Sequence, residues 1–333
     1  MNREHDDRPA VRIGFAGFWD GFDPQDNFFT RLLAPAYRLE VVDRPDYLVY
    51  SQVGGGRRDH LRHDCTRIFF TGEQIAPDWN TCDWAFTFEH SSNPRHFRLP
   101  LWAIYFDPAR LVKPEGFDPA AVVSRKTRFC GFVVSNPLCE TRNRFFHKLS
   151  KYKPVDSGGK LFNTLGERVA DKHAFLSECR FTIAFENESH PGYTTEKLPE
   201  AMLADSIPIY WGDPLVGRDF DTTSFLSAHD SASLDDLVDR VVAVEESPEL
   251  QRQLLSRPWY RDNRVPVGAD AAAILGQFGR IFGSADEPIA RRKSLVRTLG
   301  LHRLPAEANS IRRRLVRKYL KLRLASFRPG ETA

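Results

Sequence analysis

Long apolar stretches are the first feature that this sequence lacks. Its hydrophobic runs are only as long as strands, so no segment of the 333 residues is predicted to cross a membrane as a helix. Residues 1–9 are charged and contain no apolar segment, so we do not expect a standard secretory signal. The five cysteines are widely spaced and form no Cys-x-x-Cys, which argues against a disulfide scaffold or a zinc ribbon and favours a reducing cytoplasm.

An excess of positive charge is also absent from most of the chain, although not from its end. Residues 291–333 hold 13 Lys and Arg and two acidic residues, whereas the preceding residues hold 34 basic and 42 acidic ones. This distribution does not suit a general nucleic-acid binder. Apolar residues at helical spacing between 311 and 327 predict a basic amphipathic helix that lies on an anionic membrane surface. The alternative is a helix packed against the N-terminal domain with its basic side chains in solvent.

The order of apolar and amphipathic segments predicts an α/β protein. Short apolar runs alternate with helical patterns, as in βαβ units, and three prolines between residues 108 and 119 break the pattern. We therefore expect an N-terminal domain over 1–115, a second domain over 116–285 and a basic helical tail over 286–333. The two domains are predicted to be Rossmann-like and to face each other across a cleft. No Gly-x-Gly-x-x-Gly follows the first strand, which disfavours a dehydrogenase.

The densest group of polar residues lies in residues 185–197. An apolar strand over Phe181–Phe185 ends there, and a helix is predicted to begin near Lys197 because Pro199 is tolerated only in a first helical turn. The carboxyl end of such a strand and the start of the next helix are suited to bind a ligand with a phosphate group. The alternative is an ordinary surface turn with an N-capping threonine. Side chains suited to hold sugar or ribose hydroxyls are Asn187, Tyr193 and Glu196.

Several motifs together carry a resemblance to a known family. They are Phe70-Thr71-Gly72-Glu73, Arg142-Asn143, Phe185-Glu186-Asn187, Tyr193-Thr194-Thr195-Glu196-Lys197 and Ile207-Pro208-Ile209-Tyr210-Trp211-Gly212. This set, within residues 11–230, resembles the α-1,3/4-fucosyltransferases of glycosyltransferase family 10, and bacterial members look most similar. The resemblance implies a GT-B fold and the transfer of L-fucose from GDP-β-L-fucose with inversion at the anomeric carbon.

The resemblance also implies roles for individual residues. Glu73 matches the general base of the acceptor-side domain, and Glu196 gains a second, catalytic role beside a cation-like fucosyl ring. Positive charges aimed at the GDP leaving group stabilise the transition state more than the substrate. The residues that match the family's donor-binding positions are Arg142, Asn187, Tyr193, Glu196 and Lys197.

The expected partners follow from these roles. No cofactor or metal is required, because Arg142 and Lys197 already supply positive charge, and stimulation by a divalent cation is left open. The formal Asp-x-Asp at 219–221 is interpreted as a surface turn. We expect an N-acetyllactosamine-like acceptor, free or lipid-linked, an α-1,3 linkage, and no nucleic acid. The alternatives are a transferase for another GDP-sugar and an inactive nucleotide-sugar-binding or glycan-binding protein. The expected location is cytoplasmic, peripheral on the inner face of the cytoplasmic membrane through residues 291–333.

Overall fold

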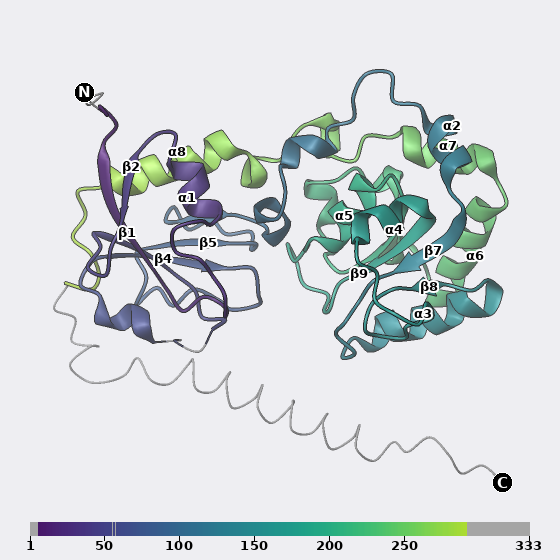
Figure 1. Ribbon diagram of the computed structural model, residues 1–333, viewed down its shortest axis with the longest axis horizontal. Helices are drawn as coiled ribbons and strands as arrows, with labels where there is room; N and C mark the ends of the chain where they lie inside the picture. Colours follow the sequence, from purple (N-terminus) through teal and green to yellow (C-terminus); the bar gives the residue numbers. More distant parts are fainter. Residues whose placement is uncertain (1–5, 55, 57, 292–333) are drawn as a thin grey trace, which may run out of the picture.

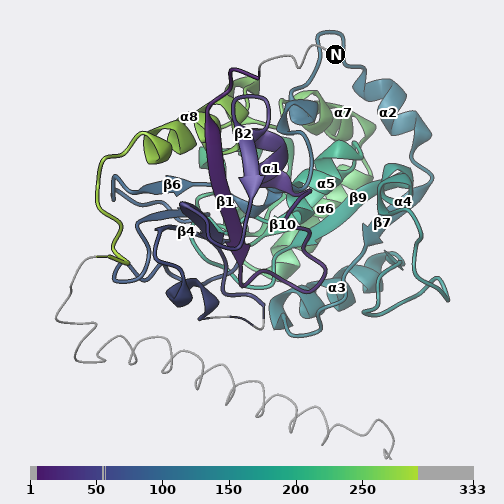
Figure 2. The same ribbon diagram turned by 60° about the vertical axis from the view of Figure 1, so that its left-hand side comes forward.

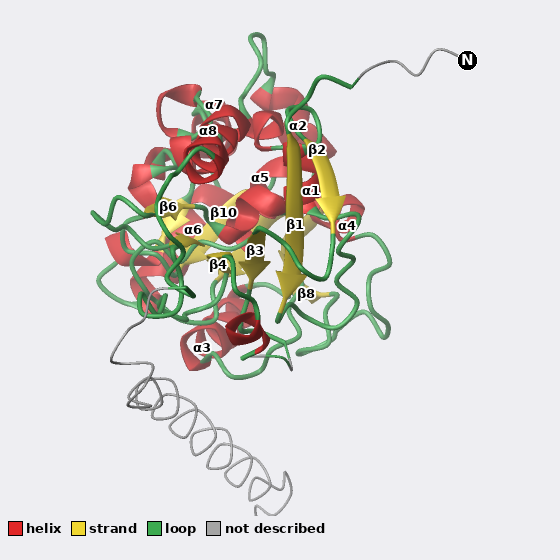
Figure 3. Cartoon of the chain, turned by 90° about the vertical axis from the view of Figure 1, so that its left-hand side faces the viewer, coloured by secondary structure: helices red, strands yellow, loops and turns green. Residues whose placement is uncertain are grey.

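Two α/β domains, each built on a parallel sheet, make up the protein (Figure 1). The computed structural model describes residues 6–54, 56 and 58–291. The first sheet has the order β2-β1-β3-β4-β5-β6, which Figure 3 shows from the side of this domain. The first domain contains β1 (Ala10–Ala16), α1 (Phe28–Leu33), β2 (Arg38–Val41), β3 (Tyr47–Tyr50), β4 (Thr66–Thr71), β5 (Trp84–Thr87) and β6 (His96–Arg98).

The second sheet has the order β11-β10-β9-β7-β8 and is also parallel throughout. Its central strand β9 is a nearly continuous buried run, which is typical of a parallel sheet with both faces covered. The second domain contains α2 (Pro119–Arg125), β7 (Arg128–Phe132), α3 (Glu140–Tyr152), β8 (Asp156–Ser157), α4 (Lys172–Glu178), β9 (Cys179–Phe185), α5 (Lys197–Leu203), β10 (Ile207–Trp211), β11 (Leu226–Ser227), α6 (Leu234–Glu245) and α7 (Pro248–Ser256). The predicted α/β class and the helix start at Lys197 are confirmed.

The last described helix, α8 (Ala271–Phe282), packs on the first domain although it follows the second in the sequence (Figure 1, Figure 2). The ring of Phe278 stacks on Phe86 of β5 with centroids 4.8 Å apart, and it meets Phe29 of α1 at 6.0 Å. The sequence prediction places this helix in the second domain, over 116–285. Its packing nevertheless joins it to the first sheet, so the chain crosses between the domains twice.

The segment after α8 continues along the first domain. The Ile289 N–H donates to the Asp83 carboxylate at 2.7 Å, and Arg291 donates to the Asp64 carbonyl at 3.0 Å. The first described residues of the predicted tail thus contact the first domain. The predicted amphipathic helix and its membrane surface lie outside the described residues. Within the described part of the chain, no helix is both long enough and apolar enough to cross a membrane.

Lys113 lies in the first of the two segments that pass between the domains and binds the second one. Its backbone N–H donates to Asn263 Oδ1, and Asn263 Nδ2 donates back to the Lys113 carbonyl, both at 2.9 Å. Its Nζ donates to the carbonyls of Leu255 and Arg257 and lies 3.6 Å from the centre of the Trp259 ring. Burial lowers the pKa of Lys113 to about 7. Burial therefore disfavours the charged form of Lys113 relative to the neutral amine.

We predict that Lys113 makes the stability of the protein depend on pH. Above pH 7 the folded chain loses the Lys113 proton while the unfolded chain keeps it up to about pH 10.4, so the free energy of unfolding rises with pH in that range. The contribution is at most about 1.4 kcal/mol per pH unit. Denaturant unfolding of Lys113→Met between pH 7 and 9.5 should give a shallower slope than wild type. Lys148→Met, which removes a half-buried lysine paired with Asp235, should keep the wild-type slope. Equal slopes for all three proteins would contradict the account.

Candidate active site

A buried carboxylate, Glu186, organises the carboxyl end of β9. One of its oxygens accepts from the Thr195 N–H at 2.7 Å, and the other accepts from Thr195 Oγ1 at 2.6 Å and from Lys197 Nζ at 3.0 Å. The Glu186 side chain is fully buried. A Cβ on Gly212 would lie 2.4 Å from Glu186 Cγ, so only glycine leaves room for the carboxylate at that position. Glu186 therefore fixes the start of α5 and the position of the Lys197 ammonium.

The Lys197 ammonium lies between two carboxylates. It donates to Thr195 Oγ1 at 2.7 Å and, at the longer distance of 3.5 Å, to Glu196 Oε1. Burial lowers the pKa of Lys197, but Glu186 and Glu196 raise it more, and the net shift is upward. Burial raises the pKa of Glu196, while Lys197 and nearby donors lower it, and the net shift is downward. Both groups are thus charged at neutral pH, and the cation has a fixed position.

Arg142 on α3 holds this loop through hydrogen bonds to its backbone and to Asn187. Its fully buried guanidinium donates from Nη1 to the Phe185 carbonyl at 3.2 Å and to Asn187 Oδ1 at 2.9 Å, and from Nη2 to the Asn136 carbonyl at 2.6 Å. Its Nε is buried and has no partner among the described residues. Arg142 therefore ties α3 to the end of β9 and orients the Asn187 amide, with its charge directly beneath the loop.

A second buried carboxylate, Asp213, shapes the part of the loop that reaches the first domain. It accepts from the Gly192 N–H at 2.7 Å and from Thr194 Oγ1 at 3.3 Å. Gly192 has a φ of +83°, and a Cβ there would lie 2.6 Å from the Phe88 carbonyl, so the turn requires glycine. The buried ring of Tyr193 packs edge-on against Phe88 with centroids 5.1 Å apart. The loop thus spans the space between the two domains.

Two carboxylates stand at neighbouring strand ends on the opposite, first-domain side. The Glu73 N–H donates to Thr71 Oγ1 at 3.0 Å after β4, and the Glu89 N–H donates to Thr87 Oγ1 at 3.1 Å after β5. Thr71 and Thr87 are register partners, so the two Thr-x-Glu turns lie side by side. Burial raises the pKa of Tyr193, and the charge of Glu73 raises it further.

The structure brings together most residues that the sequence singled out. Lys197 contacts Glu196, Arg142 contacts Asn187, and Glu73 lies near Tyr193. Sequence reasoning missed the two buried carboxylates that hold these groups in place. Their signal was present, because a charged residue one or two positions after an apolar strand needs a partner when it is buried. The missed residues are Glu186 and Asp213.

The interpretation of residues 219–221 as a surface turn is wrong for Asp219. Its carboxylate is buried and pairs with the Arg98 guanidinium of the first domain at 2.7 and 3.1 Å. The sequence gives no sign of this pair because the two residues are 121 positions apart. Among the residues described, no group of three or more His, Cys, Asp or Glu side chains is placed to hold a metal ion.

We predict that Glu186→Gln destabilises the second domain. Gln keeps an acceptor for Thr195, but the Lys197 ammonium then has only its hydrogen bond to Thr195 and the longer ion pair with Glu196, and removing one partner of a buried pair costs about 3 kcal/mol. Denaturant unfolding of the full chain measures the loss. Glu188→Gln, a change in the exposed part of the same loop, should stay within about 0.5 kcal/mol of wild type. Equal stability of the two variants would show that Glu186 does not organise the loop.

Comparison with known sequences gives a consistent family assignment. Residues 13–105 match the family model "Alpha-(1,3)-fucosyltransferase FucT N-terminal domain", and residues 123–272 match "Glycosyltransferase family 10 (fucosyltransferase) C-term". The chain is 30% identical to the alpha-(1,3)-fucosyltransferase FucT of Helicobacter pylori in an alignment of 274 residues that covers 70% of this chain and 57% of that protein. It is 31% identical over 148 residues to human 4-galactosyl-N-acetylglucosaminide 3-alpha-L-fucosyltransferase 9, covering 43% of this chain and 40% of that protein. The chain thus spans less than two thirds of the length of these relatives.

Solved structures share the same two-domain architecture. A crystal structure of an alpha1,3-fucosyltransferase superposes with a TM-score of 0.74 and 25% identity, over 89% of this chain and 95% of that one. A structure of an alpha1,3-fucosyltransferase with GDP-fucose superposes with a TM-score of 0.70 and 24% identity, over 86% and 94% of the two chains, and it supports the fold alone. The predicted GT-B arrangement of two Rossmann-like domains is confirmed by these matches.

Proposed function

Because this chain belongs to glycosyltransferase family 10, the fucosyltransferases, we propose that it transfers L-fucose from GDP-β-L-fucose to an N-acetylglucosamine-containing glycan in α-1,3 linkage. One observation carries the proposal: a fixed ammonium, Lys197, stands at the end of the loop that packs Tyr193 against the first domain, and an exposed carboxylate, Glu73, follows β4 of that domain. An inverting transfer needs a cation for the leaving group and a base for the acceptor. The printed names of the relatives support the choice of donor and acceptor.

The donor diphosphate binds at Lys197. The Lys197–Glu196 contact is 3.5 Å long, whereas the Lys197–Glu186 contact is 3.0 Å, so the Glu196 contact is the one that the diphosphate displaces. Glu186 keeps the ammonium in place, and an N–H of Lys197 turns to a phosphate oxygen. Glu196 is then available to accept from a hydroxyl of the sugar nucleotide.

The remaining donor contacts come from the loop around Lys197. The Arg142 charge beneath the loop adds to the positive potential at the diphosphate, and Arg142 holds the Asn187 amide ready for a ribose or fucose hydroxyl. Tyr193, which belongs to the same loop, packs against Phe88 and closes the donor site toward the first domain. These charges stabilise GDP more as the glycosidic bond breaks, because the diphosphate gains negative charge in the transition state. The step as proposed uses no metal.

The acceptor is activated by Glu73. Its carboxylate takes the proton of the acceptor hydroxyl while that oxygen forms a bond to the fucose C1 from the face opposite GDP. The C1–O bond to the diphosphate breaks, its electron pair stays on the phosphate oxygen, and the configuration at C1 inverts. Glu196 on the donor side places negative charge near the cation-like ring, and Glu73 later releases its proton to solvent.

Replacing Glu73 by Gln tests the assignment of the base. Gln keeps the size and hydrogen bonding of the side chain but cannot take the proton, so kcat for transfer to N-acetyllactosamine should fall about 100-fold. The affinity for GDP-fucose, measured by calorimetry, should stay at the wild-type value. Glu89→Gln is the matched control, because Glu89 occupies the same Thr-x-Glu turn on the adjacent strand. Similar kcat values for Glu73→Gln and wild type, or an equal loss in Glu89→Gln, would remove Glu73 from this role.

Replacing Lys197 by Ala tests the leaving-group assignment. The variant loses the ammonium that stabilises the departing diphosphate, so kcat/KM for transfer should fall about 100-fold or more, with losses in both kcat and donor affinity. Lys148→Ala removes a lysine that pairs with Asp235 on the surface and should behave as wild type. A Lys197→Ala enzyme with normal kcat would place the diphosphate elsewhere.

We also propose that residues 292–333 bind an anionic membrane surface on the cytoplasmic side. The positive charge concentrated in this segment exceeds what a merely solvent-exposed surface requires. Deleting it leaves the contacts of Ile289 and Arg291 with the first domain intact. The full chain should sediment with vesicles that contain anionic lipid, whereas the shortened chain should stay in the supernatant and still use soluble acceptors. Equal sedimentation of both proteins would contradict the proposal.

A further inference from the structure

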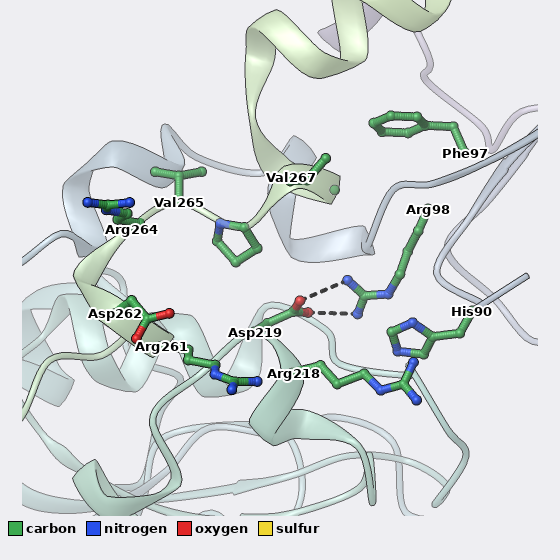
Figure 4. Close-up of a pocket in the computed structure, with 12 residues that line it drawn as sticks. His90, Phe97, Arg98, Arg218, Asp219, Arg261, Asp262, Arg264, Val265 and Val267 are labelled. Carbon is green, nitrogen blue, oxygen red and sulfur yellow. Dashed lines mark hydrogen bonds and ion pairs between the residues drawn. The ribbon is translucent and has the colours of Figure 1, made fainter.

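A cavity lies between the domains, next to the place where Gly192 approaches the Phe88 carbonyl, to which Arg98 Nε donates at 3.1 Å. It has a volume of about 460 Å³, within the usual range for small-molecule sites. The first domain contributes His90 and Arg98, and the second contributes Arg218 with the second crossing, residues 261–268. Figure 4 shows the Arg98–Asp219 pair at its centre, with the side chains of Arg218 and Arg261 next to it and His90 beside Arg218.

The charges that line this cavity do not balance. Four arginines and two aspartates line it, and one of the aspartates, Asp219, is already paired with Arg98. The side chains of Arg218, Arg261 and Arg264 have no ion pair among the described residues, and Asp262 is the only other carboxylate of the described lining. Burial lowers the pKa of His90, and the Arg98 and Arg218 charges lower it further, as expected where the potential is positive. The cavity therefore has an excess of guanidinium groups.

The loop that carries Arg261 and Arg264 is held in an unusual conformation. Asp262 and Asn263 both have positive φ, at 59° and 50°, which is costly for residues other than glycine. Asn263 is fixed by its two hydrogen bonds to the Lys113 backbone. The fold thus keeps the Arg261 loop in the lining of the cavity at some cost in backbone energy.

We propose that this cavity binds an anionic group of the glycan acceptor, a phosphate or a carboxylate, and that Arg218 and Arg261 hold it. Guanidinium groups bind such oxyanions through paired, charge-assisted hydrogen bonds. This inference rests on the proposed fucosyl transfer, because it assigns a substrate class to the same enzyme. The acceptor class is an anionic glycan, in which the charged group lies one or two sugars away from the hydroxyl that receives fucose.

The position of the cavity relative to Glu73 supports this class of acceptor. Glu73 follows β4, and the cavity residues His90 and Arg98 follow β5 and end β6, the next two strands of the sheet. Two strand spacings are about 10 Å, a distance that a short oligosaccharide spans. An acceptor that lies along the carboxyl edge of this sheet therefore places its hydroxyl at Glu73 and its anionic group at Arg218 and Arg261.

The test compares acceptors that differ only in charge. Initial rates are measured with N-acetyllactosamine, with the same disaccharide carrying a phosphate monoester, and with the same disaccharide extended by a sugar carboxylate. The wild-type kcat/KM should be about tenfold higher for at least one anionic acceptor than for the neutral one. The double variant Arg218→Gln/Arg261→Gln should bring this ratio close to one. Arg125→Gln, which removes an exposed arginine outside the cavity, should keep the wild-type ratio.

Two further measurements distinguish binding of an anionic acceptor from binding of a free anion and from failure of the proposed transfer. Calorimetry measures the affinity of the enzyme for the phosphorylated and neutral disaccharides in the absence of donor. Because this affinity can be measured even if no fucose is transferred, failure of the proposed function and failure of this inference are distinguishable. Titration with inorganic phosphate identifies a site for the free ion. A wild-type ratio near one, a ratio that the double variant leaves unchanged, or arginine-dependent binding of free phosphate without preference for the anionic disaccharide would overturn the inference.

Discussion

The loop at the carboxyl end of β9, where the donor is proposed to bind, depends on the contacts of the buried Glu186 carboxylate. A carboxylate without water is tolerated only when donors surround it, and Glu186 receives them from Thr195 and Lys197. Those contacts determine where α5 begins and where the Lys197 ammonium points. Because Glu186 and Glu196 raise the pKa of Lys197, the cation persists at neutral pH. The chemistry proposed for the leaving group therefore depends on a residue that does not itself contact the donor.

The second constraint is the alignment of the two domains. Gly192 approaches the Phe88 carbonyl so closely that no side chain fits, and the buried Arg98–Asp219 pair joins the domains next to this contact, because Arg98 Nε donates to the same carbonyl. Helix α8 returns to the first sheet, and Lys113 fastens the two crossings to each other. Together these contacts hold the 185–197 loop against the first domain, whose sheet also carries Glu73. The proposed transfer between two substrates requires this relative position, since the proposal assigns one half of the site to each domain.

The sequence predicted local features well and contacts between distant segments poorly. Alternating apolar runs predicted the two parallel sheets, and Pro199 predicted the start of α5, because both effects arise within a few residues. The pairing of Arg98 with Asp219 and the packing of α8 on the first domain depend on segments far apart in the chain. The motif around Lys197 predicted a phosphate-binding loop, but only the structure shows that Glu186 and Asp213 hold it. A polar residue in a motif looks the same whether it contacts a ligand or a neighbouring backbone.

The central claim is that GDP-fucose and the acceptor react across the interdomain space with inversion. The most direct measurement is nuclear magnetic resonance of the purified product formed by the full chain from GDP-β-L-fucose and N-acetyllactosamine. We expect an α-linked fucose on O3 of the N-acetylglucosamine, because attack opposite GDP converts the β-linked donor into an α-linked product. A β-linked fucose would require a different mechanism, and no fucosylated product under conditions in which GDP-fucose binds would contradict the proposed transfer.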